Sequence, residues 1–250
     1  WISFGKTRYY LDSNGVMVTG KQVIDGTTYT FASDGKLIVE SKRGWKTVNG
    51  KKYYYNENGV AVTGWQTIDG KKYFFMPEGY MMTGWISFGS TKYYLGTDGV
   101  MRTGWQTING KKYFFMPEGY MMTGWISFGQ TRYYLMPDGH MLTGWCSFGS
   151  TKYYLASDGK MVRGWQTISG KKYYFNTDGI MQTGWQTIDG KKYFFMPEGY
   201  MMTGWISFGK TRYYLDKNGV MQTGWQFISN TWYYFRTNGT LDDSCTTDQL

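Results

Sequence analysis

A tryptophan recurs every 20 residues through most of this 250-residue chain, and this period constrains the fold more than any other feature. The spacing runs unbroken from Trp45 to Trp225, Trp1 begins the same unit, and residues 21–44 form one longer copy without the tryptophan. The sequence therefore predicts twelve copies of one short module. Because a module of this size cannot bury an apolar face alone, the copies are expected to stack into one elongated array.

We expect the array to occupy residues 1–241 and a separate tail to occupy residues 242–250. The tail leaves the repeat pattern and is predicted to fray. The first residue falls on a repeat start, so the chain is interpreted as a fragment whose parent could carry a catalytic domain further N-terminal. The twelve copies start at residues 1, 21, 45, 65, 85, 105, 125, 145, 165, 185, 205 and 225.

Composition excludes several classes of function. An aromatic content of 20% is too high for a disordered chain, and no apolar stretch is long enough to span a membrane. The net charge of +9 favours anionic partners, but the charge is spread along the array and no nucleic-acid-binding motif occurs, so nucleic acid is not expected. One histidine and two cysteines leave no catalytic triad and no metal cluster. We therefore expect no enzyme activity, no metal and no cofactor.

Each copy, numbered from its tryptophan as position 1, predicts a β-hairpin. Positions 5–6 carry Gly-X in five copies, such as Gly89-Ser90, and most others have forms such as Asp69-Gly70. These pairs are typical of type II′ and type I′ hairpin turns respectively. Aromatic and β-branched residues at positions 1–4 and 7–11 predict the two strands. A second turn at positions 13–15 contains glycine in every copy.

This hairpin would pair position 1 with 10, 2 with 9, 3 with 8 and 4 with 7, so two faces alternate along the strands. Positions 2, 4, 7, 9 and 11 are predicted to form the core face, with Ile or Phe at position 4 and Tyr at position 9. Positions 1, 3, 8 and 10 combine Trp, Ser or Thr, Lys or Arg, and Tyr or Phe. This second face is interpreted as a ligand groove. The copy at 21–44 keeps Ile24 and Phe31 on the first face but has Lys21 and Thr30 on the second.

The candidate ligand-binding residues lie on the second face. A flat ring such as Trp85 opposite Tyr94 can stack on a sugar, while Lys92 hydrogen-bonds its hydroxyl groups. Two alternatives stay open: the tryptophans could only pack one hairpin on the next, and the cations could be solvated charges that prevent strand-edge aggregation. The full candidate set is Trp65, Trp85, Trp105, Trp125, Trp145, Trp165, Trp185, Trp205, Trp225, Tyr94, Tyr134, Tyr154, Tyr214, Lys92, Arg132, Trp232 and Tyr234.

The segments GWQTIDGKKYFF, GWISFGSTKYYL and NTDGIMQTGW resemble the cell-wall-binding repeats shared by three groups of proteins. These are choline-binding modules of bacterial surface proteins, glucan-binding repeats of glucosyltransferases, and receptor-binding repeats of clostridial toxins. The resemblance covers about residues 1–241. It implies an all-β solenoid of stacked two-stranded β-hairpins in a left-handed superhelix, with ligands between successive hairpins. It also implies a secreted or cell-surface protein of a Gram-positive bacterium.

The branches of this family differ at position 8. Choline-binding modules resemble GW…WYYL, in which a tryptophan at position 8 completes an aromatic cage, whereas position 8 here is Lys or Arg in ten copies and Trp only at Trp232. A fixed cation there opposes a quaternary ammonium ligand. We therefore predict a non-catalytic, multivalent module for a polysaccharide or cell-wall polymer, including anionic ones. Choline of teichoic acid, a host glycan, and a structural spacer or self-association array are the alternatives, and the oligomeric state is left open.

Overall fold

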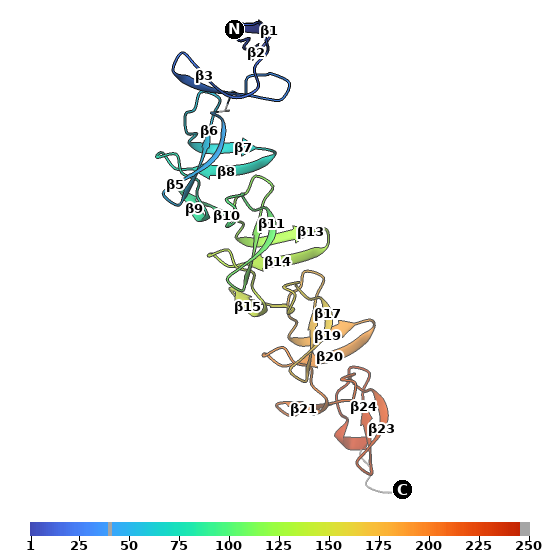
Figure 1. Cartoon of the computed structure of the whole chain (residues 1–250). Helices are drawn as coiled ribbons and strands as arrows, with labels where there is room; N and C mark the ends of the chain where they lie inside the picture. Colours follow the sequence, from blue (N-terminus) through green and yellow to red (C-terminus); the bar gives the residue numbers. More distant parts are fainter. Residues whose placement is uncertain (40–41, 246–250) are drawn as a thin grey trace. The chain divides into compact units, whose positions relative to one another are not determined.

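The computed structural model describes residues 1–39 and 42–245, and in these ranges the chain forms twelve consecutive antiparallel hairpins (Figure 1). The only helical element of the described residues is a short 3-10 turn, η1 (Asp243–Cys245). The predicted all-β class of stacked two-stranded hairpins is therefore confirmed. The strands are β1 (Ile2–Phe4), β2 (Thr7–Tyr9), β3 (Gly20–Ile24), β4 (Thr27–Phe31), β5 (Gly44–Val48), β6 (Lys51–Tyr55), β7 (Gly64–Ile68), β8 (Lys71–Phe75), β9 (Gly84–Phe88), β10 (Thr91–Leu95), β11 (Gly104–Ile108), β12 (Lys111–Phe115), β13 (Gly124–Phe128), β14 (Thr131–Leu135), β15 (Gly144–Phe148), β16 (Thr151–Leu155), β17 (Gly164–Ile168), β18 (Lys171–Phe175), β19 (Gly184–Ile188), β20 (Lys191–Phe195), β21 (Gly204–Phe208), β22 (Thr211–Leu215), β23 (Gly224–Ile228) and β24 (Thr231–Phe235).

The strand register agrees with the prediction. In the β9–β10 hairpin Trp85 lies opposite Tyr94, and Ser87 lies opposite Lys92. In every hairpin after the first, the first strand starts one residue earlier than expected, because the glycine before position 1 pairs with position 11, as Gly84 does with Leu95. Since directly opposed residues share a face, the tryptophan, the aromatic residue at position 10 and the cation at position 8 lie on the same side of each hairpin.

Both turn classes form as the sequence predicts. Gly89 has a φ of +59° in a Gly-X turn, whereas Asp69 and Gly70 have φ values of +50° and +73°. A single left-handed residue is the requirement of a type II′ turn and two consecutive ones are the requirement of type I′. The last hairpin also has two consecutive left-handed residues, Ser229 and Asn230, although its turn contains no glycine.

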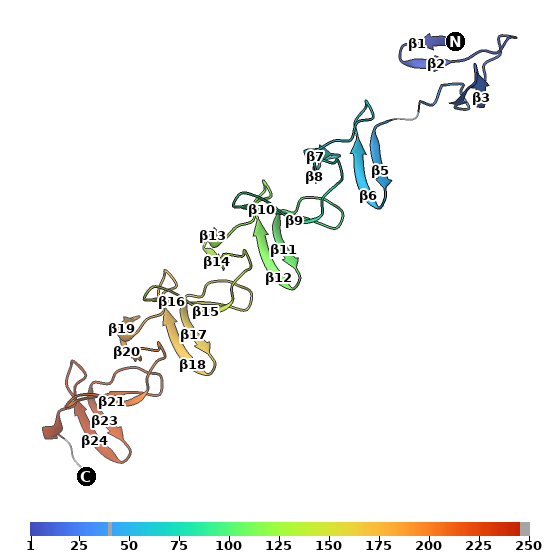
Figure 2. The same ribbon diagram turned by 90° about the vertical axis from the view of Figure 1, so that its left-hand side faces the viewer.

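The chain divides into two compact units, Trp1–Arg102 and Thr103–Leu250. Within each unit, most neighbouring hairpins are joined by a backbone hydrogen bond from the position 17 N–H to the position 8 carbonyl of the preceding copy. Met81 donates to Lys52 at 2.7 Å, and Met181 donates to Lys152 at 2.9 Å. Figure 2 shows β5–β6 broadside and β7–β8 nearly end-on, so these neighbouring hairpins are rotated against each other.

The core of each unit consists mainly of position 11 side chains, because this position faces the neighbouring copies. Phe75, Phe115, Phe175, Phe195, Phe235, Leu95, Leu135, Leu155 and Leu215 are fully buried. Position 11 is Phe in the copies with type I′ turns that contribute to this set, and Leu in those with type II′ turns. The two turn classes therefore carry different core residues.

The prediction that position 4 always belongs to the core is wrong for the type II′ copies. Ile68 is buried at position 4, but Phe88 is 45% exposed there. In three of the five type II′ copies the isoleucine at position 2 is buried instead, namely Ile86, Ile126 and Ile206. In the type I′ copies with glutamine at position 2, the side-chain amide hydrogen-bonds the backbone. Gln66 Nε2 donates to the Thr63 carbonyl at 2.7 Å. The aliphatic contribution of the first strand thus moves from position 4 to position 2, and phenylalanine at position 4 turns outward.

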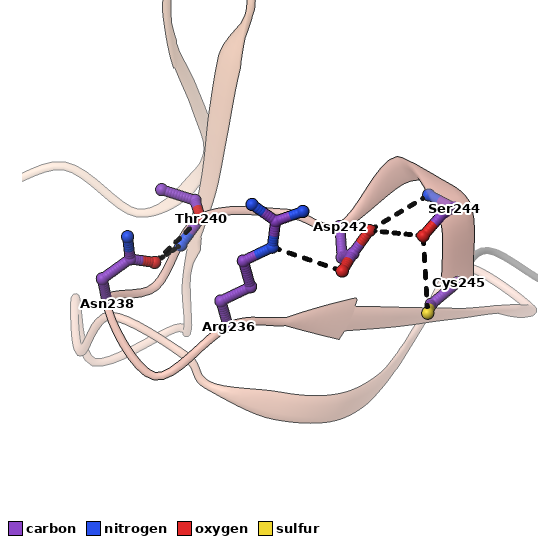
Figure 3. Close-up of polar contacts among 6 residues, drawn as sticks. All are labelled: Arg236, Asn238, Thr240, Asp242, Ser244 and Cys245. Atoms are coloured by element: carbon purple, nitrogen blue, oxygen red, sulfur yellow. Dashed lines mark hydrogen bonds and ion pairs between the residues drawn. The ribbon is translucent and has the colours of Figure 1, made fainter.

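The C-terminal end of the stack is held by polar contacts around Asp242 (Figure 3). Its carboxylate accepts hydrogen bonds from the Ser244 hydroxyl at 2.7 Å and from Arg236 Nε at 3.2 Å. The Asp242 N–H donates to the Tyr234 carbonyl at 2.9 Å. Residues 242–245 of the predicted tail are thus hydrogen-bonded to the last hairpin or to one another, while residues 246–250 lie outside the described part of the chain.

Candidate ligand-binding site

The tryptophan at position 1 lies between two hairpins. Trp45 contacts Tyr54 of its own hairpin, with ring centroids 5.2 Å apart, and Tyr73 of the following copy at 5.1 Å. The tryptophan-bearing face of one hairpin therefore packs on the core face of the next, and the two predicted faces are not separate. The predicted pairs of positions 1 and 10 form within each hairpin, at Trp85–Tyr94, Trp125–Tyr134, Trp145–Tyr154, Trp205–Tyr214 and Trp225–Tyr234.

The position 8 cation lies over the tryptophan ring of its own hairpin in seven copies. Arg132 Cζ is 4.6 Å from the centroid of Trp125, and Lys72 Nζ is 4.9 Å from that of Trp65. Such cation–π contacts occupy the ring face that a quaternary ammonium group would use. Five of these cations stay exposed to solvent, so their interpretation as solvated edge charges remains a prediction beside this contact; the seven cations are Arg8, Lys72, Lys112, Arg132, Lys172, Lys192 and Arg212.

A phenylalanine from the following copy covers the tryptophan at four junctions between hairpins. Phe88 lies 6.2 Å from Trp65 and 5.1 Å from Phe74, measured between ring centroids. In each case the following copy has a type II′ turn, which turns its position 4 phenylalanine outward. We call these closed junctions, and their tryptophans, Trp65, Trp105, Trp125 and Trp185, are all half-buried.

At other junctions the following copy has a type I′ turn and a position 11 phenylalanine, and we call these open. Trp45 contacts Phe75 at 5.8 Å and is 40% exposed, and Trp145 contacts Phe175 at 5.9 Å and is 42% exposed. Trp1 and Trp205 are exposed at open junctions of the same kind. Trp165 is half-buried, although its junction is also open.

Two hollows lie at open junctions and use the same positions of the repeat. The first, of about 250 Å³, is lined by Trp45, Thr47 and Lys52 with Tyr73 of the next copy and Asp98 of the copy after that; Lys46 and Met81 also border it. The second, of about 340 Å³, is lined by Trp145, Ser147, Lys152, Tyr173 and Glu198. Among the described residues, no cation lies over the ring of Trp45 or Trp145. Each hollow therefore combines a free indole face and a lysine from one copy, a tyrosine from the next copy and a carboxylate from the copy after that.

The ionisation of the first hollow follows from its contacts. Burial raises the pKa of Asp98, but hydrogen bonds from the Val100 N–H at 3.0 Å and from Arg102 at 2.8 Å outweigh it, so the pKa lies below its usual value. Burial, followed by the charges of Asp98 and Asp69, raises the pKa of Tyr73. At neutral pH the hollow thus presents a carboxylate, a neutral phenol and a lysine around an indole face.

A third hollow, in the second unit, has a different character. It has a volume of about 480 Å³ and lies beside Trp125 and Phe128. Ser127 supplies its only uncharged polar side chain, and no charged residue lines it; the other lining residues are Phe114, Met116, Pro117, Met122 and Ile126. It lacks the paired charges of the hollows at Trp45 and Trp145.

Sequence reasoning missed part of the site. Trp45 was outside the candidate set although it shares the period, and Tyr73 was assigned to the core alone. Asp98 and Glu198 were not among the candidates, because no local pattern shows that they reach a tryptophan two copies earlier. Of the remaining candidates, Lys92 lies opposite Ser87, and Trp232 contacts Phe227 of its own hairpin at 5.2 Å.

An all-β stack of aromatic hairpins with hollows between the copies defines a class of repeat binding modules, and comparison with known proteins gives the same class. A choline-binding repeat matches residues 1–41, 42–65, 62–103, 102–143, 162–185, 182–222 and 203–241, and a putative cell wall binding repeat matches residues 143–161. The chain belongs to the choline-binding repeat family. The prediction of a cell-wall-binding type of repeat module is therefore confirmed.

Solved structures from Streptococcus pneumoniae share the fold. CbpJ of strain TIGR4 is 27% identical with a TM-score of 0.72, covering 94% of this chain and 100% of that one. Choline binding protein F, solved in the presence of a peptidoglycan analogue, is 28% identical with a TM-score of 0.62, covering 89% and 92%. Glucosyltransferase-S of Streptococcus mutans serotype c is 50% identical over 48 residues, which are 19% of this chain and 3% of that protein. The chain thus matches only a small part of that enzyme's length.

In residues 1–39 and 42–245, no group of three His, Cys, Asp or Glu side chains is placed to hold a metal ion. The same part of the chain has no helix long and apolar enough to cross a membrane.

Proposed function

We propose that the chain is a non-catalytic module that binds a polysaccharide or cell-wall polymer through hydroxyl-rich sugar rings. The observation that carries this proposal is the pair of hollows at Trp45 and Trp145, which repeat the same chemistry 100 residues apart. The free indole face can stack on a sugar ring. Lys52 or Lys152 can donate hydrogen bonds to its hydroxyl groups, and Asp98 or Glu198 can accept them. Each hollow therefore offers a stacking platform with a donor and an acceptor on its border.

The repetition of such sites on one chain makes the binding multivalent. Each hollow is shallow and open, so a single sugar unit is expected to bind weakly. A polymer that engages two tethered sites gains affinity through the effective concentration of the second site, without any new contact. We propose that the twelve copies act together as one array over residues 1–241.

Choline is the second candidate ligand. The carboxylates of Asp98 and Glu198 beside exposed tryptophans favour a quaternary ammonium group, and the family takes its name from choline. Lysine at position 8 opposes the same ligand by charge repulsion, and seven tryptophans already carry an internal cation. The balance of these charges favours the sugar ligand.

We propose that the module works outside the cell, on the surface of a Gram-positive bacterium, as the targeting part of a longer secreted protein. The match to cell wall binding repeats supports this location, as do the relatives from streptococci. Any catalytic activity of the parent protein would then lie in another part of that protein.

Retention on immobilised ligands tests the proposed function. The whole chain is applied to α-glucan, purified cell wall, mucin glycan and choline-bearing resins at equal protein load. We expect retention on glucan or wall, and weaker retention of the double variant Trp45→Ala/Trp145→Ala, with far-UV circular dichroism to show that the strands persist. Stoichiometric elution from the choline resin by free choline would reverse the ranking. Absence of retention on all four resins would favour a structural spacer.

A further inference from the structure

We infer that the turn class of each hairpin decides whether the tryptophan of the preceding copy is accessible to a ligand. The inference rests on the proposed function for the nature of that ligand, but the accessibility itself depends only on the packing. A type II′ hairpin closes the site in front of it, and a type I′ hairpin does not cover it with a phenylalanine. Trp165 lies in front of a type I′ hairpin and is half-buried, with Lys172 Nζ 5.8 Å from its ring centroid.

The closing group is the phenylalanine at position 4 of the following copy. In the type II′ hairpin β9–β10 the isoleucine at position 2, Ile86, is buried, and Phe88 turns outward against Trp65 and Phe74. Lys72 covers the same indole from its own hairpin at 4.9 Å. Trp65 is therefore contacted by a phenylalanine and a cation, and little of its ring face is left for a ligand.

The type I′ hairpin β7–β8 has the opposite arrangement. Its position 4 residue, Ile68, is buried and cannot reach Trp45 from outside. Phe75 contacts Trp45 from the core instead, at a ring distance of 5.8 Å, and leaves Trp45 exposed. Both hollows that combine a lysine and a carboxylate, at Trp45 and Trp145, lie in front of type I′ hairpins.

Two further groups complete a site, and they come from different copies. Lys52 borders the hollow instead of covering Trp45, and Asp98 reaches it from the second copy along. Lys152 and Glu198 repeat this arrangement at Trp145. A complete site therefore spans three consecutive copies. The number of ligand sites is then smaller than the number of junctions, and the order of turn classes along the chain determines where they lie.

An exchange of cassettes within the chain tests the inference. Residues 65–75 (WQTIDGKKYFF) and 85–95 (WISFGSTKYYL) have equal length, and both keep tryptophan at position 1, lysine at position 8 and tyrosine at position 9. Writing the second sequence into residues 65–75 should close the site at Trp45. Writing the first into residues 85–95 should open the site at Trp65.

Hydroxyl-radical footprinting of the whole chain measures this directly, because oxidation of each tryptophan can be assigned to its own tryptic peptide by mass spectrometry. In the parent chain we expect faster oxidation of Trp45 and Trp145 than of Trp65 and Trp125. The first exchange should lower the oxidation rate of Trp45 to that of Trp65, and the second should raise that of Trp65. Trp145 lies in the other compact unit and serves as the control within the same molecule.

A single substitution tests the same inference in case the exchanged chains do not fold. Phe88→Ala removes an exposed ring and leaves the buried Ile86 in place, so the hairpin should persist while oxidation of Trp65 rises. Equal oxidation of Trp45 and Trp65 in the parent chain would overturn the inference. An oxidation rate of Trp65 that stays unchanged both in the exchange at residues 85–95 and in Phe88→Ala would also overturn it.

Titration with isomaltohexaose and with choline chloride separates this inference from the proposed function. If the parent chain binds isomaltohexaose, the exchange at residues 65–75 should remove the site at Trp45. Trp145→Ala should remove the site at Trp145. Sugar binding that is unaffected by closure would overturn the inference. If footprinting changes as expected while the parent chain binds choline but not the sugar or soluble wall polysaccharide, the gating holds and the proposed ligand class is wrong.

Discussion

The side chain of Met81 occupies the space that a Cβ atom on Gly99 of the following copy would need. The same contact joins Met201 to Gly219, so a methionine at position 17 packs against the glycine at position 15 of the next copy. Gly99 also has a φ of +80°, a conformation that residues with a side chain rarely adopt. This glycine is therefore required both by its backbone conformation and by the stacking of the copies. These methionines are therefore packing residues between copies, and Met81 also borders a hollow.

Gly99→Ala should destabilise the stack more than Gly70→Ala. Gly70 has a similar φ of +73°, but open space surrounds the position of its Cβ. Both variants carry the left-handed strain of about 1 kcal/mol, and Gly99→Ala adds an overpacking cost of about 1–3 kcal/mol against Met81. Urea denaturation of the two variants measures the difference. Because Met81→Ala makes room for the new methyl group, it should reduce the penalty of Gly99→Ala, and an equal penalty in both glycine variants would contradict the stacking role.

Lys52→Trp should create choline binding at the Trp45 site. The substitution removes the cation that repels a quaternary ammonium and adds a second indole, while Tyr73 and the carboxylate of Asp98 remain. An aromatic cage with a nearby carboxylate attracts such a group by about 1–2 kcal/mol, which is close to a tenfold gain in affinity. Titration with choline chloride, followed by tryptophan fluorescence, measures the effect.

The matched control is Lys72→Trp at the closed junction of Trp65. Phe88 still covers that tryptophan, so no gain in choline affinity is expected. A similar gain at both positions would show that closure by Phe88 does not limit access.

Sugar binding at the Trp45 site should be insensitive to pH until the solution is strongly acidic. The pKa of Asp98 lies below its usual value of 3.8, so its hydrogen-bonded carboxylate persists above that value and is lost only as the pH falls through the lowered pKa. In a Trp145→Ala background, affinity for isomaltohexaose should stay constant from pH 7 to about 4.5. Asp98→Asn should weaken binding across this range. Loss of binding between pH 7 and 5 would point to another titrating group.

The local structure could be predicted from the sequence because each hairpin is determined by short-range rules. Turn glycines such as Gly89 and Gly70 determine the turn class, and the turn class determines the register that places Trp85 opposite Tyr94. Position 11 was correctly assigned to the core. These assignments need only one copy and the stereochemistry of its backbone.

The site was predicted less completely because it depends on relations between copies. The exposure of Phe88 follows from how β9–β10 packs on the hairpin before it, which strand periodicity does not contain. Asp98 lies 53 residues from Trp45 in sequence and joins the same hollow only after three copies have stacked. A periodic sequence identifies the face of a hairpin, whereas access to that face is determined by the neighbouring copies.

Asn230→Gly should stabilise the last hairpin. Asn230 has a φ of +67° at the second position of a type I′ turn, where the other type I′ copies have glycine. Glycine removes the left-handed strain but adds entropy to the unfolded chain, so the net gain is expected to be a few tenths of a kcal/mol to about 1 kcal/mol. Hydrogen exchange of the β23–β24 amides measures this locally, because a stacked-repeat chain need not unfold in one step. The reverse change, Gly170→Asn, gives the Ser169 turn the same Ser-Asn sequence and should destabilise β17–β18 by a similar amount. If both substitutions slow exchange, or both accelerate it, turn strain does not control the stability of these hairpins.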